Sequence, residues 1–220
     1  MAVIATMKKF PLILSAMLLL AVSSCKKEEP QEEPQTYQYL PANSGSWWAY
    51  VLIQHDGQGG SSVMSRDTLR ALCTTTIDGE TFNTFRGSLM TPYTPNTPDW
   101  YVRDSSNYLI NSNSVVVLPY LNFTDTFNRV GPEGGISKER YQKLYQDAEP
   151  LTIDAGTFST IDFRNEVVFE NTSPCGTDMA FMHQQFVDIV GMVRATYWYA
   201  TTYGCNLYVE RKLEAYHIEE

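Results

Sequence analysis

The stretch GTFSTIDFRNEVVFEN (Gly156–Asn171) decides the fold class, because its polar and apolar residues alternate. The apolar side chains share one parity and the charged side chains the other: Ile161, Phe163, Val167 and Phe169 against Arg164, Glu166 and Glu170. A period of two is that of a β-strand, whose successive side chains point to opposite faces. The stretch therefore predicts an antiparallel sheet with one apolar face and one face toward water.

The same signal recurs on both sides of this stretch. NLYVERKLEAYHI (Asn206–Ile218) alternates in the same way at the end of the chain. The segment Ser61–Met90 has two β-prone arms around Asp78-Gly79, a pair typical of tight hairpin turns. On its first arm Cys73 has the parity of Leu69, so we expect a buried thiol there. The chain thus predicts a mainly β domain.

Helix signals are few. Residues 137–148 are the best candidate, since Tyr141, Leu144 and Tyr145 have helical spacing, although a strand fits them equally well. Residues 177–189 are a second candidate for one or two helical turns. We therefore expect one or two short helices beside the sheet.

Composition limits the domain number and the partners. The chain has 220 residues, of which 43% are hydrophobic, so one globular domain is expected. The formal net charge is −9, and it falls to about −11 if Lys8 and Lys9 are removed with a leader. Such a charge argues against nucleic acid as a partner and against adsorption to anionic lipid.

The N-terminus has the three parts of a secretory signal. Two lysines precede an apolar core of about 13 residues, which is shorter than the roughly 20 that a membrane-spanning helix needs. The small residues Val22-Ser23-Ser24 then lead to Cys25, and this pattern resembles the lipobox of bacterial lipoproteins. The resemblance implies cleavage before Cys25 and acylation of that cysteine, which would anchor the chain in a membrane.

The residues after Cys25 extend this resemblance. Lys26-Lys27-Glu28-Glu29 is similar to the signal by which some Bacteroidota lipoproteins reach the outer face of the outer membrane. The implied location is the outer membrane, on the cell surface, with the periplasmic leaflet as the alternative. Residues 26–37 are rich in proline and glutamate and are expected to form a disordered tether. The expected organisation is a signal peptide (1–24), a lipidated cysteine with its tether (25–37) and a β-domain (38–220).

A second resemblance covers about residues 39–218. The blocks LPANSGSWWAY, LTIDAGTFSTIDF, FVDIVGMVRATYWYA and ERKLEAYHI resemble the recurring blocks of a class of Bacteroidota envelope lipoproteins. The resemblance implies the half-barrel of the periplasmic lipoprotein carriers, a single antiparallel sheet curved into a half-barrel or open barrel. A β-sandwich remains the alternative. The class has no established catalytic residues to transfer to this chain.

Aromatic residues are the main candidates for a ligand surface. Alternation places Trp48 and Tyr50 on one face and Trp47 on the other. Most should belong to the core, and the others could line an apolar pocket or stack on a sugar ring. The candidate ligand-facing residues are Trp47, Trp48, Tyr50, Trp100, Tyr197, Trp198 and Tyr199.

The remaining motifs predict a disulfide and no cofactor. In the oxidising envelope Cys175 and Cys205 are the favoured pair, brought together by the last hairpin. The three histidines do not have the spacing of metal ligands, and no nucleophile or phosphate-loop motif occurs. We therefore expect no metal, no cofactor and no catalytic residue.

Three functions are compatible with the sequence. The first is a non-catalytic, outer-membrane-anchored lipoprotein that binds a hydrophobic or amphipathic, lipid-like ligand on the curved sheet. The second is an accessory subunit that docks on outer-membrane protein partners. The third is a hydrolase, which needs a pair of carboxylates at reactive spacing.

Overall fold

The computed structural model describes residues 38–56, 58–87, 99–131, 137–147, 149–169, 179–198 and 208–219. All of them lie in the compact unit Tyr37–Glu220. The signal peptide, the lipobox with Cys25 and the predicted tether lie outside the described residues, as do Cys175, Cys205 and Tyr199.

The described part of the chain is built from strands. They are β1 (Trp47–His55), β2 (Ser61–Ile77), β3 (Glu80–Arg86), β4 (Asp99–Ser105), β5 (Tyr108–Asn111), β6 (Val116–Pro119), β7 (Phe127–Val130), β8 (Ser137–Gln146), β9 (Leu151–Ile153), β10 (Gly156–Phe158), β11 (Ile161–Phe169), β12 (Met179–Met182), β13 (Gln184–Val187), β14 (Gly191–Trp198) and β15 (Tyr208–His217). Their pairings are antiparallel.

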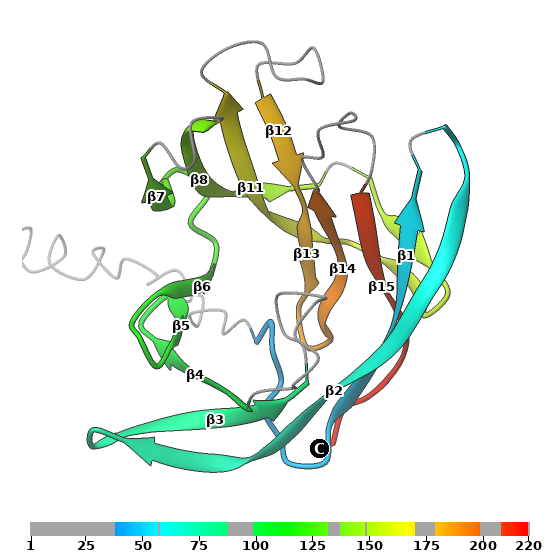
Figure 1. Cartoon of the computed structure of the whole chain (residues 1–220). Coiled ribbons are helices and arrows are strands. Elements are labelled where there is room, and N and C mark those ends of the chain that lie inside the picture. The colour runs from blue at the N-terminus through cyan, green and yellow to red at the C-terminus, as the bar shows by residue number, and fades with distance from the viewer. Residues whose placement is uncertain are drawn as a thin grey trace, which may run out of the picture. The chain divides into compact units, whose positions relative to one another are not determined.

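One sheet runs through all but the β9–β10 hairpin. Its order is β6-β5-β4-β3-β2-β1-β15-β14-β13-β11-β8-β7, with β12 beside β11. The strands curve around until the two edges, β6 and β7, come close together (Figure 1). The predicted fold class is confirmed: one antiparallel sheet, nearly closed into a barrel. The β-sandwich alternative is not what forms.

A side chain joins the two edges of the sheet. Asn128 on β7 donates from Nδ2 to the carbonyl of Val116 on β6, at 2.8 Å, and to Oε1 of Gln142, at 2.5 Å. The ring of Phe127 lies 5.9 Å from Tyr108 on β5 and 6.0 Å from Phe163 on β11. The barrel is therefore closed by an amide and by aromatic packing at the position where a strand ladder would complete it.

The inner face of the sheet is packed with large apolar side chains. Fully buried members include Trp48, Phe85, Phe163, Leu144 and Leu213, which come from five strands far apart in sequence. Trp48 lies 6.1 Å from Phe85. Burial of this area is the main stabilising contribution to the domain.

The segment before β1 packs against the barrel core. Tyr39 and Leu40 are buried, and Gln38 pairs through its carbonyl with the amide of Ile189 in the β13–β14 turn, at 2.9 Å. Gly191, at φ 100°, has Trp48 Nε1 and the Tyr39 carbonyl each 3.4 Å from the position of a Cβ. The segment and the turn are thus fitted to each other at one end of the β1 and β14 strands.

The tight turn of the long hairpin is confirmed. Asp78 and Gly79 join β2 to β3 with φ values of 51° and 85°. Positive φ at both central residues is what a type I′ turn requires. Aspartate and glycine tolerate that conformation better than other residues.

Neither helix candidate forms a helix in the described residues, and for the first the strand alternative is confirmed. Residues 137–146 form β8, which pairs with β11, and the described part of 177–189 forms β12 and β13 with a turn. Tyr141 and Tyr145 are four residues apart, which places them on one side of a strand as well as of a helix. Leu144 then points into the core, where it is 1% exposed.

The prediction for Cys73 is also wrong, because Cys73 is a free and exposed thiol. The ladder between β2 and β3 shifts register between Ala71 and Thr74. A bulge adds one residue to a strand and reverses the facing of those beyond it. The parity that Cys73 shares with Leu69 therefore does not place it in the core.

An arginine lies on the apolar side of β15. Arg211 is fully buried, its guanidinium carbon is 3.7 Å from the centre of the Tyr50 ring, and it donates to Oδ1 of Asp67 at 3.1 Å. Tyr50 donates its hydroxyl to the carbonyl of Met192 at 2.8 Å. An ion pair between β2 and β15 is thus placed beside the apolar core.

The tyrosines near this ion pair predict sensitivity to alkali. Burial raises the pKa of Tyr197 to about 12, against the opposing effect of Arg211, and raises that of Tyr50 too. A pKa that is higher in the folded state stabilises the fold below the unfolded pKa of about 10, and this stabilisation is lost as the pH rises toward 12. We expect the free energy of unfolding, measured by urea titration, to decline between about pH 10 and pH 12. Tyr197→Phe should show a shallower decline, and an unchanged slope would contradict this assignment.

Candidate functional site

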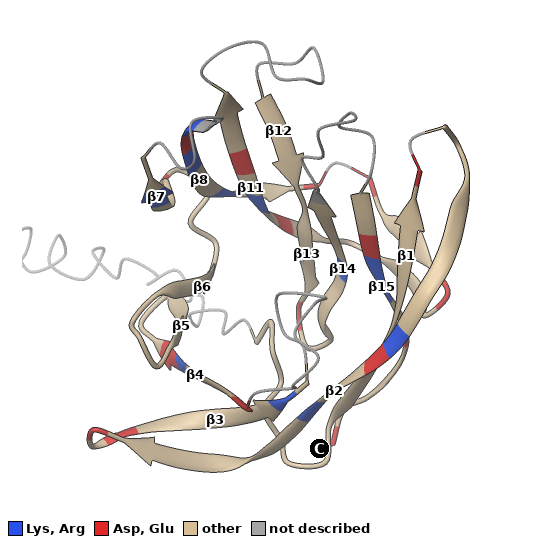
Figure 2. Ribbon diagram, in the orientation of Figure 1, with Lys and Arg blue, Asp and Glu red and all other residues tan. Residues whose placement is uncertain are grey.

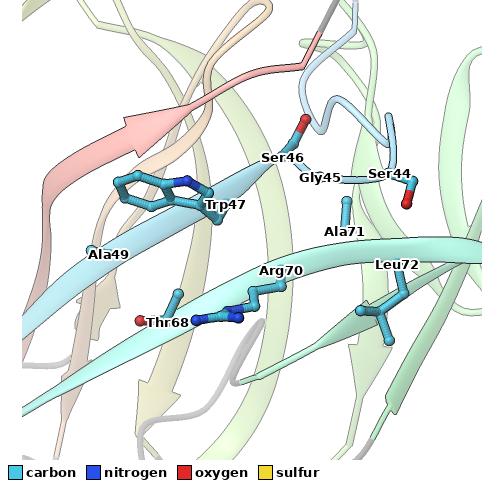
Figure 3. Close-up of a pocket in the computed structure, with 9 residues that line it drawn as sticks. All are labelled: Ser44, Gly45, Ser46, Trp47, Ala49, Thr68, Arg70, Ala71 and Leu72. Atoms are coloured by element: carbon cyan, nitrogen blue, oxygen red, sulfur yellow. The ribbon is translucent and has the colours of Figure 1, made fainter.

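A cavity of about 640 Å³ lies over β1 and β2, beside the loop that precedes β1 (Figure 3). The strands contribute Trp47 and Ala49 from β1 and Thr68 and Arg70 from β2, and the loop contributes residues 44–46. The cavity thus combines an indole, a guanidinium and hydroxyl groups.

The strand register puts the two main side chains together. Trp47 pairs with Arg70, and Ala49 pairs with Thr68. Because Trp48 points into the core, Trp47 points to the opposite face of the sheet. Arg70 extends over β2 toward Thr68 on the same side (Figure 3).

The loop beside the cavity is held by hydrogen bonds to β2 and to the C-terminal segment. Gly45 has φ 106°, a conformation that favours glycine. The Ser46 hydroxyl oxygen accepts from the amide of Glu219 at 3.0 Å, and Asn43 donates to the Glu219 carbonyl at 2.7 Å. The amide of Ala71 donates to the Ser46 carbonyl at 2.9 Å. The wall of the cavity is therefore fixed by bonds to β2 and to the C-terminal segment.

Trp47 is half-buried and is supported on one side. Its ring lies 6.4 Å from that of His217, with 27° between the planes, and His217 is 3.0 Å from a carboxylate oxygen of Glu219. The small side chain of Ala49 leaves room next to the indole. This arrangement offers a flat apolar surface to a ligand.

Arg70 supplies a positive charge at the cavity. Its side chain is exposed, and no ion pair joins it to any residue in the described ranges. Its neighbour on the next strand, Arg86, has its own carboxylate in Asp99, at 2.9 Å. A guanidinium with this freedom can bind a carboxylate or a phosphate with two parallel hydrogen bonds.

A second polar cluster lies on β11 and its neighbours. Asp162 is fully buried and accepts from Arg164 Nε at 3.0 Å, His183 Nδ1 at 2.7 Å and the amide of Gln184 at 3.1 Å. The Arg164 guanidinium carbon also lies 4.2 Å from the centre of the Tyr145 ring. Three donors satisfy this buried carboxylate, so the cluster is explained as a structural ion pair.

Another group of polar contacts lies across β1, β14 and β15. Glu210 accepts from Arg194 Nε at 2.6 Å and lies 3.1 Å from Nε2 of His55. Acidic and basic residues lie next to one another along β15 (Figure 2). Glu210 is only 8% exposed, so the face predicted to be open to water is partly closed by its own ion pairs.

The predicted ligand-facing residues separate into different environments. Trp47 lines the cavity, whereas Trp48 and Tyr50 are fully buried in the core. Trp100 and Tyr197 are half-buried against the same core. The side chain of Trp198 is not described, and Tyr199 lies outside the described residues.

Sequence reasoning missed Arg70 and Thr68. Both have the parity of the polar face of β2, and the facing of Trp47 was visible from its neighbour Trp48. The pairing of Trp47 with Arg70 was not visible, because it depends on the register between β1 and β2.

In the described part of the chain, no three His, Cys, Asp or Glu side chains are close enough to hold a metal ion. No helix among the described residues has the length and apolar character needed to cross a membrane.

Two solved structures are similar to this chain. A Bacteroides fragilis NCTC 9343 protein assigned as exported, with a YmcC-like fold, is 12% identical with a TM-score of 0.47, and the match covers 83% of this chain and 100% of that one. A Parabacteroides distasonis ATCC 8503 protein assigned as a lipoprotein is 13% identical with a TM-score of 0.45, with the same coverage. No family model and no curated protein matches the chain.

Proposed function

We propose that this protein is a non-catalytic, lipid-anchored envelope lipoprotein whose β-domain binds an amphipathic ligand in the Trp47–Arg70 cavity. The ligand would have a flat or extended apolar part and a negatively charged group. The apolar part would lie on the indole of Trp47, and the charged group would bind the guanidinium of Arg70.

The cross-strand pairing of Trp47 with Arg70 is the observation that carries this proposal. A half-buried indole and an exposed guanidinium lie next to each other on the wall of a cavity of about 640 Å³. That volume is within the usual range of about 300–1,000 Å³ for small-molecule sites. The inner face of the sheet, where the sequence predicted the ligand, is filled at this position by Trp48, Tyr50 and Phe85.

Anilinonaphthalene sulfonate, a flat apolar anion, tests the cavity. We expect the full chain to bind this probe with enhanced fluorescence, and dodecanoate to displace it. Trp47→Ala and Arg70→Ala should each weaken binding by about tenfold, since a stacking contact or a charge-assisted hydrogen bond contributes roughly 1–2 kcal/mol.

Arg129→Ala is the matched control. Arg129 is an exposed arginine on β7 that pairs with Glu139, on a different part of the sheet from the cavity. Its replacement removes the same charge from the protein and should leave probe affinity unchanged. If Arg129→Ala weakens probe binding as much as Arg70→Ala, the probe responds to net charge and the cavity proposal is wrong.

The lipid anchor has a separate prediction. Intact-mass analysis of the native protein should find a chain that begins at Cys25 and carries diacylglyceryl and an additional acyl chain. Cys25→Ser should retain its first 24 residues and should carry neither diacylglyceryl nor an acyl chain in the same mass measurement. A native protein with a free thiol at Cys25 would overturn the anchor and, with it, the outer-membrane location.

A further inference from the structure

Two exposed aliphatic residues hold a backbone conformation that rarely suits them. Ile189 has φ 68° and is 61% exposed, and Leu121 has φ 53° and is 45% exposed. The left-handed region is unfavourable for bulky residues, above all for β-branched ones, and is usually held by glycine or asparagine. Neither side chain is buried, so packing within the domain does not explain why isoleucine and leucine stand there.

Both residues flank the point where the chain enters the domain. The Ile189 amide donates to the Gln38 carbonyl at 2.9 Å, and the amide of Gln38 donates to Oδ1 of Asp188 at 2.8 Å. On the other side, the ring of Tyr39 lies 5.8 Å from that of Tyr120, the residue before Leu121. The start of the described chain lies beside the β13–β14 turn (Figure 1).

A third apolar side chain belongs to the same loop as Leu121. Phe123 is 39% exposed. Asn122 holds its loop, because it accepts from the amide of Asp125 at 3.1 Å and donates to the carboxylate of Asp125 at 2.8 Å. We name Leu121, Phe123 and Ile189 the apolar tip.

We infer that the apolar tip docks on the lipid bilayer that carries the acylated Cys25. This inference rests on the lipid anchor of the proposed function. Gln38 lies thirteen positions after Cys25 in the chain, so the distance between them cannot exceed about 45 Å in any conformation. The anchor therefore keeps the tip close to the membrane surface, and a contact too weak to hold a free protein is sufficient.

The charges near the tip indicate the kind of surface. Asp188 precedes Ile189, and Asp125 closes the loop that carries Phe123. Carboxylates are repelled by anionic headgroups, so the contact is an apolar insertion into a zwitterionic interface. Added anionic lipid should weaken it.

Tryptophan substitutions and brominated phosphatidylcholine vesicles test the docking. The lipidated full chain is reconstituted with Ile189→Trp or with Leu121→Trp, and the emission of the parent protein is subtracted. Val63→Trp is the control, because Val63 is 56% exposed and pairs with Ile53, toward the far end of β1 from Trp48 and the tip. We expect the bromine to quench most of the added emission at positions 189 and 121 and little of it at 63.

The outcomes separate the docking from the anchor. Vesicles that float with the protein but quench all three positions alike, or none, overturn the docking and leave the anchor standing. If the protein does not float with the vesicles, the lipid anchor is contradicted, and so is the docking proposal that depends on it.

Stability gives a second, independent measurement. The double variant Leu121→Asn, Ile189→Asn should have a Tm equal to or above that of the parent, because asparagine accepts the left-handed backbone more readily. The same variant should lose protection of the tip by vesicles in hydrogen exchange. A lower Tm would show that these side chains stabilise the free domain and would overturn their assignment to membrane contact.

Discussion

Replacing Trp48 with alanine is expected to lower the free energy of unfolding by about 4–5 kcal/mol. The side chain is fully buried, and its loss leaves a large cavity against Phe85. It also removes the hydrogen bond from Nε1 to the carbonyl of Val190, at 2.5 Å, which joins β1 to the turn before β14. Urea unfolding followed by circular dichroism measures the change.

The neighbouring tryptophan is the matched control. Trp47→Ala removes the same side chain one position earlier, from the half-buried cavity face. We expect a loss of no more than about 1 kcal/mol, since surface replacements away from such features have small effects. Equal destabilisation by the two variants would contradict the assignment of Trp48 to the core and Trp47 to the ligand site.

This pair of residues also shows what the sequence could predict. Alternation predicted that Trp47 and Trp48 lie on opposite faces of a strand, and the structure confirms this. The alternation in β11 and the Asp78-Gly79 turn likewise predicted strands and a hairpin that form. These features depend on neighbours within one strand or one turn, which the chain specifies locally.

Predictions that needed the register between strands did not hold. Cys73 shares parity with the buried Leu69, yet it is exposed. The pairing of β2 with β1 shifts register between Leu52 and Ile53 of β1. The pairing of β2 with β3 shifts register after Ala71 of β2. A bulge is set by the packing of neighbouring strands, so parity counted along one strand does not reveal it.

Contacts between segments far apart in the sequence could not be predicted from the sequence either. β1 pairs with β15, although most of the chain lies between these two strands. The 3.1 Å contact of His55 with Glu210 and the ion pair of Asp67 with Arg211 exist only through such pairings. The cavity depends on the same kind of information, because Trp47 and Arg70 meet only in the register between β1 and β2.

Replacing Asp67 with alanine is expected to lower the free energy of unfolding by about 3–5 kcal/mol. Asp67 accepts a hydrogen bond from Arg211, whose side chain is fully buried, while that of Asp67 is 24% exposed. The substitution removes the carboxylate from a guanidinium that water does not reach. The ring of Tyr50, at 3.7 Å, compensates for only part of this loss, because a cation–π contact contributes about 2 kcal/mol when desolvated.

The double variant Asp67→Asn, Arg211→Met decides what this ion pair does. Methionine fills much of the volume of arginine without its charge, and exchanging a buried pair for uncharged groups is often neutral or stabilising. We therefore expect the double variant to be within about 1–2 kcal/mol of the parent, clearly more stable than Asp67→Ala. Asp99→Ala, which breaks the surface pair with the exposed Arg86, should lose about 0–1 kcal/mol. A double variant as unstable as Asp67→Ala would show that the charges themselves hold β2 to β15, whereas recovery would show that the fold requires only that the charge of Arg211 be balanced or absent.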